Sequence, residues 1–405
     1  METNNSNITL GEIFRRSGEQ YIIENNPTAQ EKGIIRLLSQ CRTIGLGSHI
    51  ESCSKCDYSR ICYNSCRNRH CTQCQYKEKE QWFMKRKQEL LPVGYFHIIF
   101  TIPLQLNRLV LQNRKVMYTI LFKAASSTLL ELAKDPKHLG AVTGLLAVLH
   151  TWGQNLMEHP HLHCIVPAGG VSSDKEHWVH SKHNYFIPVQ VISSLFRGKF
   201  CDLLNKAYAS NKLQFKADMR FYDSKKNFNR LLTHLYKKNW VVHAKEPFAR
   251  PEKVLEYLSR YINRVAISNR KIIKIENNKV TFLWKDYRNN DKLKRMTIDV
   301  FEFIRRFLLH VLPDGFCKIR YYGLFANNGR KDNIEKCKTI LLQEHKLQLQ
   351  EKNENGTLIK VNNQKDFWDE LFIQIFTRNY LQCPKCKIGK MVFAGVVKPE
   401  TCDFG

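Results

Sequence analysis

The chain has 405 residues, of which 43% are hydrophobic, and its 64 lysines and arginines against 37 acidic residues give a net charge of +27. A chain of this length and apolar content can bury a substantial core, which excludes a disordered or fibrous protein. A positive surplus of this size favours a polyanionic partner and indicates nucleic acid rather than a merely basic surface.

The start of the chain and the cysteines indicate the compartment. The sequence contains no run of about 18 uncharged apolar residues, and its start lacks the apolar block of a secretory signal. We therefore expect a cytoplasmic protein without a membrane partner. In a reducing compartment, 14 cysteines that cluster as Cys-x-x-Cys pairs indicate zinc rather than disulfides.

The predicted elements mix helices with strands. Helical patterns cover, in chain order, residues 10–42, 78–91, 104–134, 251–264 and 299–312. Strand patterns cover residues 94–103, 144–151, 161–167, 279–284 and 294–298. The last two strands form a hairpin around an Asn-Asn-Asp turn, and polar residues 346–365 resemble a flexible linker. This order of elements favours an α+β fold.

Two Cys-x-x-Cys knuckles lie in a stretch that is too poor in apolar side chains to fold without a staple. The knuckles, Cys53–Cys56 and Cys71–Cys74, are separated by 14 residues, which is the spacing of a four-cysteine zinc ribbon. Four thiolates would leave no open position for water, so this zinc is predicted to be structural.

Further polar residues accompany the knuckles. A second ion could be held by members of the set Cys41, His49, Cys62, Cys66 and His70. Alternatively, the last two cysteines of this set are small buried residues, and the last histidine is a surface group or supports a ligand. Between the knuckles, Arg67 and Arg69 are suited to grip a phosphate or a base edge.

A single further knuckle, Cys383–Cys386, lies near the C-terminus and is followed by Cys402 without a second Cys-x-x-Cys. Half a ribbon is weak evidence for zinc. It is either a degraded module or part of a site that Cys402 and a residue elsewhere would complete.

A strand with two histidines is the most informative string in the chain. In His159-Pro-His-Leu-His-Cys-Ile-Val166, an extended backbone projects His161 and His163 from one face and the apolar residues from the other. Imidazoles about 7 Å apart along a strand can converge on one ion. A lone histidine pair on a strand is more often a surface feature, so this prediction depends on a second motif.

The second motif is Glu256-Tyr-Leu-Ser-Arg-Tyr-Ile-Asn-Arg264. On a helix, Tyr257 and Tyr261 stand one turn apart on one face, and Arg260 and Arg264 share that side. A tyrosine that attacks a phosphate must lose its proton, and nearby arginines would assist that loss. Alone, this spacing is typical of core packing. Combined with the histidine strand, the cysteine knuckles and the positive charge, it indicates DNA cleavage and rejoining.

These strings resemble the two-tyrosine HUH transposases of the insertion sequence ninety-one type, which are named for a histidine–hydrophobe–histidine strand and a tyrosine helix. The matching strings are residues 63–74, 159–170, 257–269 and 320–327, within a resemblance that covers residues 30–330. It implies an HUH endonuclease-like antiparallel sheet flanked by helices and preceded by a small zinc-ribbon domain. It also implies rolling-circle-like transposition of single-stranded DNA through a 5′-phosphotyrosine, in a bacterial, nucleoid-associated protein.

The resemblance also assigns roles by position. His161 and His163 would be ligands of the catalytic metal, and Tyr257 and Tyr261 the nucleophiles. A divalent ion would offset the charge of the scissile phosphate, and two tyrosines would permit two successive covalent attachments.

The third ligand of the catalytic metal is expected to be Gln154, with Glu158 and His159 as alternatives. Histidine combined with glutamine or a carboxylate suits Mg²⁺ or Mn²⁺, although imidazoles bind other transition metals more tightly.

The predicted organisation has four parts. They are a helical lead-in (1–40), a zinc-binding domain (41–80), an HUH tyrosine catalytic domain (81–335), and a polar linker and C-terminal tail (336–405). Two other functions stay open. An HUH replication initiator or relaxase would use the same motifs, although such proteins do not usually carry an N-terminal ribbon. A non-catalytic zinc-ribbon regulator would bind DNA without cutting it.

Overall fold

The computed structural model describes residues 8–74, 82, 86–182, 186–248, 266–286, 292–353 and 382–398, with side chains except at 246–248 and 345–353. The chain divides into two compact units, one of residues 1–75 and 348–405 and the other of residues 76–347. The C-terminal segment, which the sequence predicts as a separate tail, therefore belongs to the same unit as the cysteine knuckles.

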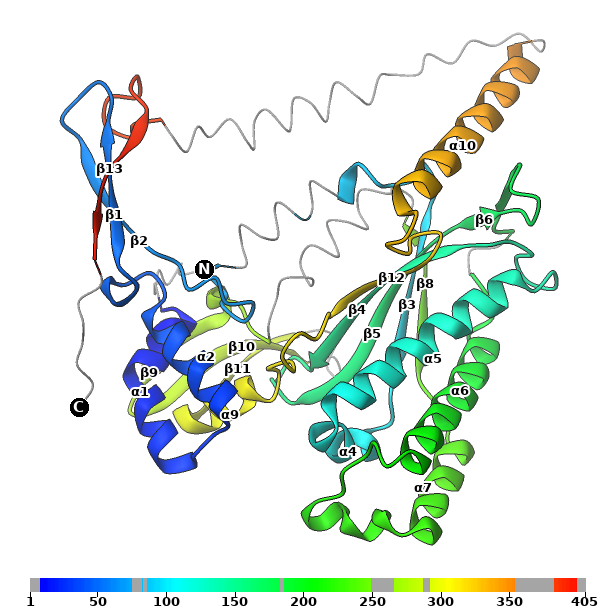
Figure 1. The fold of residues 1–405 in the computed structure, drawn as a ribbon, viewed down its shortest axis with the longest axis horizontal. Helices are drawn as coiled ribbons and strands as arrows, with labels where there is room; N and C mark the ends of the chain where they lie inside the picture. The colour runs from blue at the N-terminus through cyan, green and yellow to red at the C-terminus, as the bar shows by residue number, and fades with distance from the viewer. Residues whose placement is uncertain are drawn as a thin grey trace. The chain divides into compact units, whose positions relative to one another are not determined.

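A five-stranded sheet forms the centre of the larger unit, with the strand order β12-β4-β5-β3-β8 (Figure 1). Its strands are β3 (Tyr95–Thr101), β4 (Gly144–Trp152), β5 (Glu158–Pro167), β8 (Val242–Phe248) and β12 (Ile319–Gly323). Every neighbouring pair is antiparallel. β4 and β5 form a hairpin, and β5 also pairs with β3, so β5 lies in the middle of the sheet.

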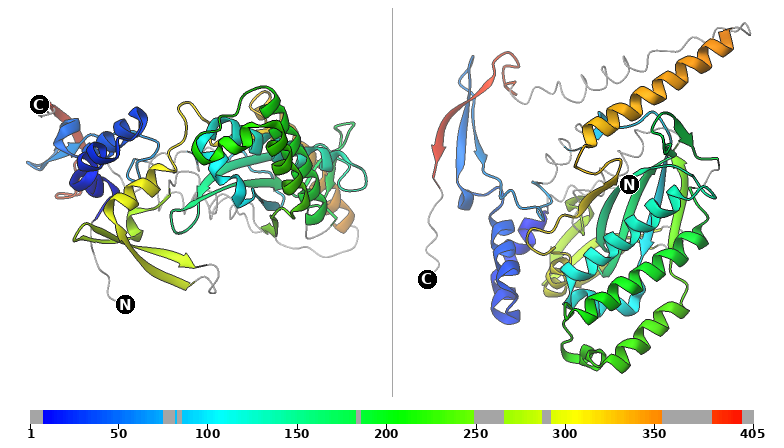
Figure 2. Two further views of the ribbon diagram at one scale, coloured as in Figure 1. Left: turned by 90° about the horizontal axis from the view of Figure 1, so that it is seen from below. Right: turned by 45° about the vertical axis from the view of Figure 1, so that its right-hand side comes forward.

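Helices cover one face of this sheet. They are α4 (Asn107–Gln112), α5 (Arg114–Lys134), α6 (Val189–Ala209) and α7 (Lys225–Lys237), and the right view of Figure 2 shows the last three side by side. Alternate strand residues such as Phe100, Leu149 and Leu162 are buried in the core formed with these helices. Among the described residues, only α5 has the length and composition of a membrane span, and it is mostly buried inside the fold.

The opposite face of the sheet is covered over part of its length by α10 (Arg330–Asn353). There Leu146 and Ile165 of the sheet share a core with Ile334 and Cys337 of the helix. The short strands β6 (Gly169–Val171) and β7 (Trp178–His180) contribute to this second core. The remainder of this face is where the histidines lie.

A smaller sheet follows in the same unit, with the order β11-β10-β9. It consists of β9 (Ile272–Glu276), β10 (Lys279–Asp286) and β11 (Lys292–Asp299), and α9 (Val300–Leu308) follows it. Asp299 begins this helix because its carboxylate accepts hydrogen bonds from the backbone N–H groups of Phe301 and Glu302 at 2.8 and 3.3 Å. The predicted pairing of the two strands and the start of the helix after them are confirmed, whereas the helix ends at Leu308 rather than at residue 312. The predicted Asn-Asn-Asp turn lies outside the described residues.

The other unit contains α1 (Leu10–Asn25), α2 (Ala29–Gln40) and a sheet of order β13-β1-β2, made of β1 (Ser48–Cys53), β2 (Ser59–Tyr63) and β13 (Met391–Val397). The helix predicted over 10–42 is two helices. Asn26 ends the first in the left-handed region at φ 39°, and Thr28 opens the second with a capping box to Glu31.

The predicted α+β fold is confirmed. Short 3₁₀ helices connect the longer elements at η1 (Ile44–Leu46), η2 (Leu104–Leu106), η3 (Ala217–Asp223) and η4 (Asn269–Lys271). α10 extends to Asn353, so the beginning of the predicted linker 346–365 is helical, as expected for a run rich in Gln, Glu, Lys and Leu. The predicted helix 251–264 and half of the predicted helix 78–91 lie outside the described residues.

Candidate metal centres

Three histidines meet on the central sheet. His161 and His163 project from β5, and the hairpin register sets His150 of β4 directly opposite His161. Period-two alternation sends Leu162, between the pair, into the helix-covered core, as the sequence predicts. The potential ligand atoms of the three histidines lie within 4.8 Å of one another. Small side-chain rotations would therefore bring them onto one ion.

Hydrogen bonds orient the two histidines of β5. His161 Nδ1 lies 2.6 Å from the carbonyl oxygen of His159. Because a carbonyl only accepts, Nδ1 carries the proton and Nε2 carries the lone pair that a metal needs. His163 Nδ1 lies 2.8 Å from Nε2 of His97 on β3. If His163 donates in this pair, its Nε2 is also the ligand atom.

Burial keeps these rings neutral. It lowers the pKa of His161 to about 4, and it lowers the pKa of His163 well below the ordinary value. Burial and, secondarily, the charge of Lys245 lower the pKa of His97 to about 3. Neutral imidazole is the form that binds metal, so the centre is ready for a cation near neutral pH.

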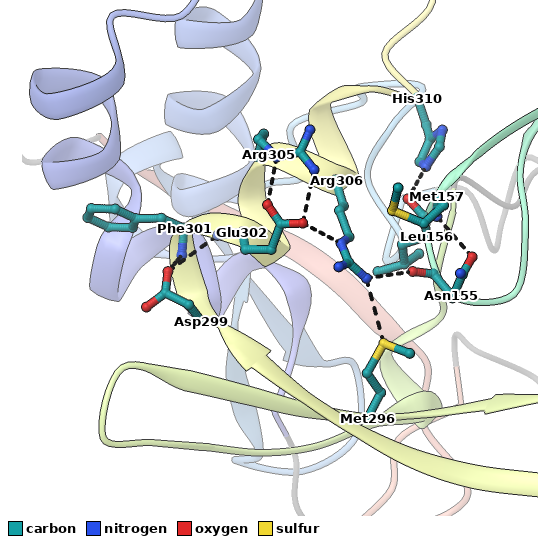
Figure 3. A network of polar contacts seen from close by, with 10 residues as sticks. All are labelled: Asn155, Leu156, Met157, Met296, Asp299, Phe301, Glu302, Arg305, Arg306 and His310. Carbon is teal, nitrogen blue, oxygen red and sulfur yellow. Dashed lines mark hydrogen bonds and ion pairs between the residues drawn. The ribbon is translucent and has the colours of Figure 1, made fainter. Parts of the chain in front are cut away.

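The turn between β4 and β5 is fixed from outside the hairpin (Figure 3). Arg306 of α9 donates from Nη1 to the carbonyl of Asn155 at 3.1 Å. The buried ring of His310 lies 3.0 Å from the carbonyl of Leu156 through Nε2. Leu156 has a left-handed backbone, with φ 61°, which these contacts help to hold. The register that sets His150 opposite His161 is therefore supported by α9 and the residues after it.

Glu302 organises the arginine that reaches this turn. Its carboxylate pairs with Arg305 at 2.6 Å and with Arg306 at 2.7 Å. Hydrogen bonds from Arg305 and then Arg306 lower the pKa of Glu302 to about 2. The carboxylate thus stays ionised and holds Arg306 toward Asn155 (Figure 3).

The three predicted candidates for the third ligand have different surroundings in the structure. The amide oxygen of Gln154 accepts a hydrogen bond from Lys271 Nζ at 2.9 Å. Burial raises the pKa of Glu158 to about 8, although the charge of Arg114 in α5 acts to lower it. His159 stays near the centre, with its ring centroid 5.1 Å from that of His161. In the described part of the chain, the residue grouped with the pair is His150.

The cysteine knuckles take part in two separate clusters. Cys41, Cys66, Cys71 and Cys74 form one, and Cys53, Cys56, Cys383 and Cys386 form the other. In the first, Cys41 Sγ lies 3.5 Å from both Cys71 Sγ and Cys74 Sγ. Cys66 Sγ lies 3.6 Å from Cys74 Sγ. Hydrogen bonds from its neighbours, Cys66 first, lower the pKa of Cys41.

The predicted single ribbon of Cys53, Cys56, Cys71 and Cys74 is therefore wrong in its pairing. A Cys-x-x-Cys turn places two sulfurs side by side but does not select the other two ligands. Here the chain fold selects them, because Cys41 follows α2 and the C-terminal knuckle precedes β13. Cys402 lies outside the described residues.

The remaining predicted residues of this unit lie outside the two cysteine clusters. His49 and Cys62 group with Glu51, but Arg60 pairs with that carboxylate at 2.7 Å. The ring of His70 lies 3.1 Å from Asn68 Oδ1 through Nδ1. Arg67 is exposed with a left-handed φ of 51°, and Arg69 is half-buried.

The predicted tyrosine helix, with Tyr257, Tyr261, Arg260 and Arg264, lies outside the described residues. The chain on both sides of it is described. β8 pairs with β3 before it, and Lys271 bonds to Gln154 in the β4–β5 turn after it.

Sequence reasoning missed His150, His97 and Lys245. The predicted strands 144–151 and 161–167 contained His150 and the histidine pair, but the register that sets His150 opposite His161 came from the structure. His97 was equally visible within the predicted strand 94–103, but its pairing with His163 needs the strand order. Lys245 pairs in register with His97 from the edge strand β8.

Comparisons with known proteins agree with this architecture. Residues 144–333 match the family described as "Putative transposase", and residues 13–102 match the "Transposase zinc-binding domain". A protein of Sinorhizobium fredii named "Putative transposase y4qJ" is 44% identical over 403 residues, which cover 97% of each chain. The chain belongs to the transposases of the insertion sequence ninety-one type.

A second relative extends the comparison. The transposase for insertion sequence element IS801 of Pseudomonas savastanoi pv. phaseolicola is 26% identical over 290 residues, 71% of this chain and 68% of that protein. The zinc-binding match includes the first cysteine cluster of this transposase, so its structural zinc is supported by both family and geometry. The same match ends at residue 102, so it contains Cys53 and Cys56 of the second cluster but not Cys383 and Cys386.

Proposed function

We propose that this transposase nicks and rejoins single-stranded DNA at the ends of its element through a 5′-phosphotyrosine, in a rolling-circle-like transposition. The observation that carries the proposal is the group of His150, His161 and His163 on the central sheet. Such a protein would act in the bacterial cytoplasm on nucleoid DNA.

The three imidazoles fit a divalent ion. Burial keeps His161 and His163 neutral, the three residues come from adjacent antiparallel strands, and the backbone of His159 directs Nε2 of His161 to the ligand position. We propose His150 as the third ligand in place of Gln154, whose oxygen is engaged by Lys271. An all-nitrogen set favours Mn²⁺ over the harder Mg²⁺. Once bound, the ion would offset the charge of the scissile phosphate and orient it.

Tyr257 and Tyr261 are the proposed nucleophiles. Their support is the tyrosine motif in the sequence and the attachment of both flanks of residues 251–265 to the histidine sheet. In the first step the phenolic oxygen forms a bond to phosphorus, the bond from phosphorus to the 3′ oxygen breaks, and a 3′-hydroxyl leaves. The tyrosine proton departs, which Arg260 or Arg264 would favour by stabilising the phenolate.

Rejoining reverses these bond changes. A 3′-hydroxyl of another strand attacks the phosphotyrosine, a new phosphodiester forms, and the tyrosine regains a proton. Because the phosphotyrosine retains the phosphoester bond, the cycle needs no nucleotide cofactor. Two tyrosines would allow one attachment at each end of the element.

Two groups of cationic residues are proposed to contact DNA. Lys245 is exposed on the strand beside His97, where it could offset phosphate charge near the histidines. Arg67 is exposed beside the first cysteine cluster, and Arg69 follows it. These side chains would hold the backbone of the substrate rather than read its sequence.

The test is formation of a covalent adduct with a single-stranded oligonucleotide that carries an element end. The wild type with Mn²⁺ should form the adduct, and a Tyr257→Phe/Tyr261→Phe double variant should form none. Tyr236→Phe, at an exposed tyrosine of α7, is the matched control and should behave as wild type. An undiminished adduct in the double variant would contradict the assignment. DNA binding by the wild type without any cleavage would instead indicate a regulator.

A further inference from the structure

The second cysteine cluster joins the two ends of the chain. Cys53 Sγ lies 3.6 Å from Cys386 Sγ, although the residues are 333 positions apart. Cys56 Sγ lies 3.7 Å from Cys383 Sγ across 327 positions. All four sulfurs lie within 4.8 Å of one another. The N-terminal and C-terminal knuckles therefore face each other as two halves of one cluster.

The sulfur spacing is that of a tetrahedral metal site. With Zn–S bonds of about 2.3 Å, neighbouring sulfurs of a tetrahedron are about 3.8 Å apart. A disulfide would bring two sulfurs to about 2.05 Å. The observed separations of 3.6 and 3.7 Å match the first geometry and not the second.

In each knuckle, a backbone N–H group points at a cysteine sulfur of the same knuckle. The N–H of Lys55 lies 3.3 Å from Cys53 Sγ, and the N–H of Gly389 lies 3.3 Å from Cys386 Sγ. These contacts stabilise thiolates, the form that binds zinc. Gly389 is required sterically, because a Cβ there would lie 2.3 Å from Cys53 Sγ.

Direct hydrogen bonds also link the two knuckles. The N–H of Ser54 donates to the carbonyl of Lys390 at 2.9 Å. The N–H of Lys390 donates to Ser54 Oγ at 3.0 Å. The C-terminal knuckle is thus docked against the N-terminal one by residues that lie beside the sulfurs.

The strand after the C-terminal knuckle lacks a core that would hold it in place. Met391 is the only residue of β13 that is buried. Phe393 and Val396 are 67% and 70% exposed, and no residue of β2 is buried. A small sheet needs a buried hydrophobic face for independent stability. The backbone ladder between β1 and β13 therefore needs another source of stability.

We propose that Cys53, Cys56, Cys383 and Cys386 bind a second structural zinc ion, which fastens the C-terminal segment to the N-terminal zinc-binding region. Zinc is the metal that a closed set of four thiolates selects. The ion closes a loop of more than three hundred residues that contains the catalytic unit, and it supplies the stability that β13 lacks. The zinc-binding region of this transposase is then completed by the end of its own chain.

The zinc content of the full-length protein tests this site. We expect two thiolate-bound zinc ions per chain in the wild type and in Cys317→Ser, which removes an exposed cysteine outside both clusters. A Cys383→Ser/Cys386→Ser variant should hold one. Substitution by Co²⁺ separates these ions from any at the histidines, because only cysteine ligands produce a sulfur-to-cobalt charge-transfer band. The intensity of that band per chain should fall by half, and an unchanged zinc content and band would overturn the proposal.

A second measurement does not require a variant to fold. In the wild type, alkylation mapped by mass spectrometry should find Cys383 and Cys386 protected together with Cys53 and Cys56, and a chelator should make all four reactive. A Cys386→His variant keeps a ligand set common in zinc sites and should retain both ions. If Cys383 and Cys386 react as fast as Cys317 while Cys53 and Cys56 stay protected, the shared site does not exist. Neither measurement depends on strand transfer, so the outcome is independent of the proposed catalytic mechanism.

Discussion

The histidine centre and the cysteine clusters are built in opposite ways. The three histidines come from one hairpin, and the core beneath them is packed by helices that need no metal to assemble. The cysteines of the second cluster come from distant parts of the chain and adjoin a sheet that buries almost nothing. In the first case the fold creates the metal site, whereas in the second we infer that the metal creates part of the fold.

The largest expected effect of this difference follows from removing zinc. A chelator should abolish hydrogen-exchange protection in β1, β2 and β13, because their ladders have no buried face to stabilise them. Protection in β4 and β5 should persist. Hydrogen exchange with mass spectrometry on the full chain measures both. The contrast between the units would be lost if all five strands opened together or if none did.

A smaller effect is expected at the histidine centre, where the fold should survive loss of a ligand. His150→Ala should reduce Mn²⁺-dependent cleavage by more than about 100-fold, beyond the roughly 10–100-fold that supporting groups around a metal usually contribute. Gln154→Ala should cost no more than the roughly 10–100-fold of a supporting group, because Gln154 acts through its hydrogen bond to Lys271.

Single-turnover cleavage over a range of Mn²⁺ concentrations, with circular dichroism as the check on folding, measures these two variants. If Gln154→Ala proved the more damaging at saturating Mn²⁺, the original expectation of glutamine as third ligand would be restored.

The smallest effect concerns the support of the β4–β5 turn. Arg306→Gln removes a half-buried, charge-assisted hydrogen bond to Asn155 and should lower the free energy of unfolding by about 1.5 kcal/mol. Arg305→Gln is the matched control. It removes a more exposed ion pair with the same Glu302 and should change that free energy by less than about 0.5 kcal/mol.

Urea unfolding of the full chain would measure both arginine variants. Equal losses would show that Arg306 stabilises α9 alone and does not anchor the histidine hairpin.

The parts of the histidine centre differ in how far the sequence could predict them. His161 and His163 share a face because alternation along one strand is a local property of an extended backbone. His150 joins them only through the register between two strands, which the turn and its contacts with Arg306 and His310 support. The bounds of the predicted strands 144–151 and 161–167 do not determine that register.

The helices depend more on local information than the histidine centre does. The start of α2 is predictable from the capping residues Thr28 and Glu31, which interact within one turn. α6 and α7 escaped prediction within a basic middle section of the chain, although their buried residues Phe196, Leu204 and Phe228 pack into the main core. Their buried residues recur at helical spacing, so the sequence carries a local signal for both helices that the prediction missed.

By itself, the sequence determined the α+β class, the transposase family, the paired histidines and the presence of zinc knuckles, because each depends on residues close together in the chain. Only the tertiary structure decided that His150 completes the histidine group and that Cys53 and Cys56 face Cys383 and Cys386. Those partners are chosen by strand register and chain path, and no local spacing encodes either one. The two-tyrosine step stays a prediction of the sequence, because Tyr257 and Tyr261 lie outside the described residues.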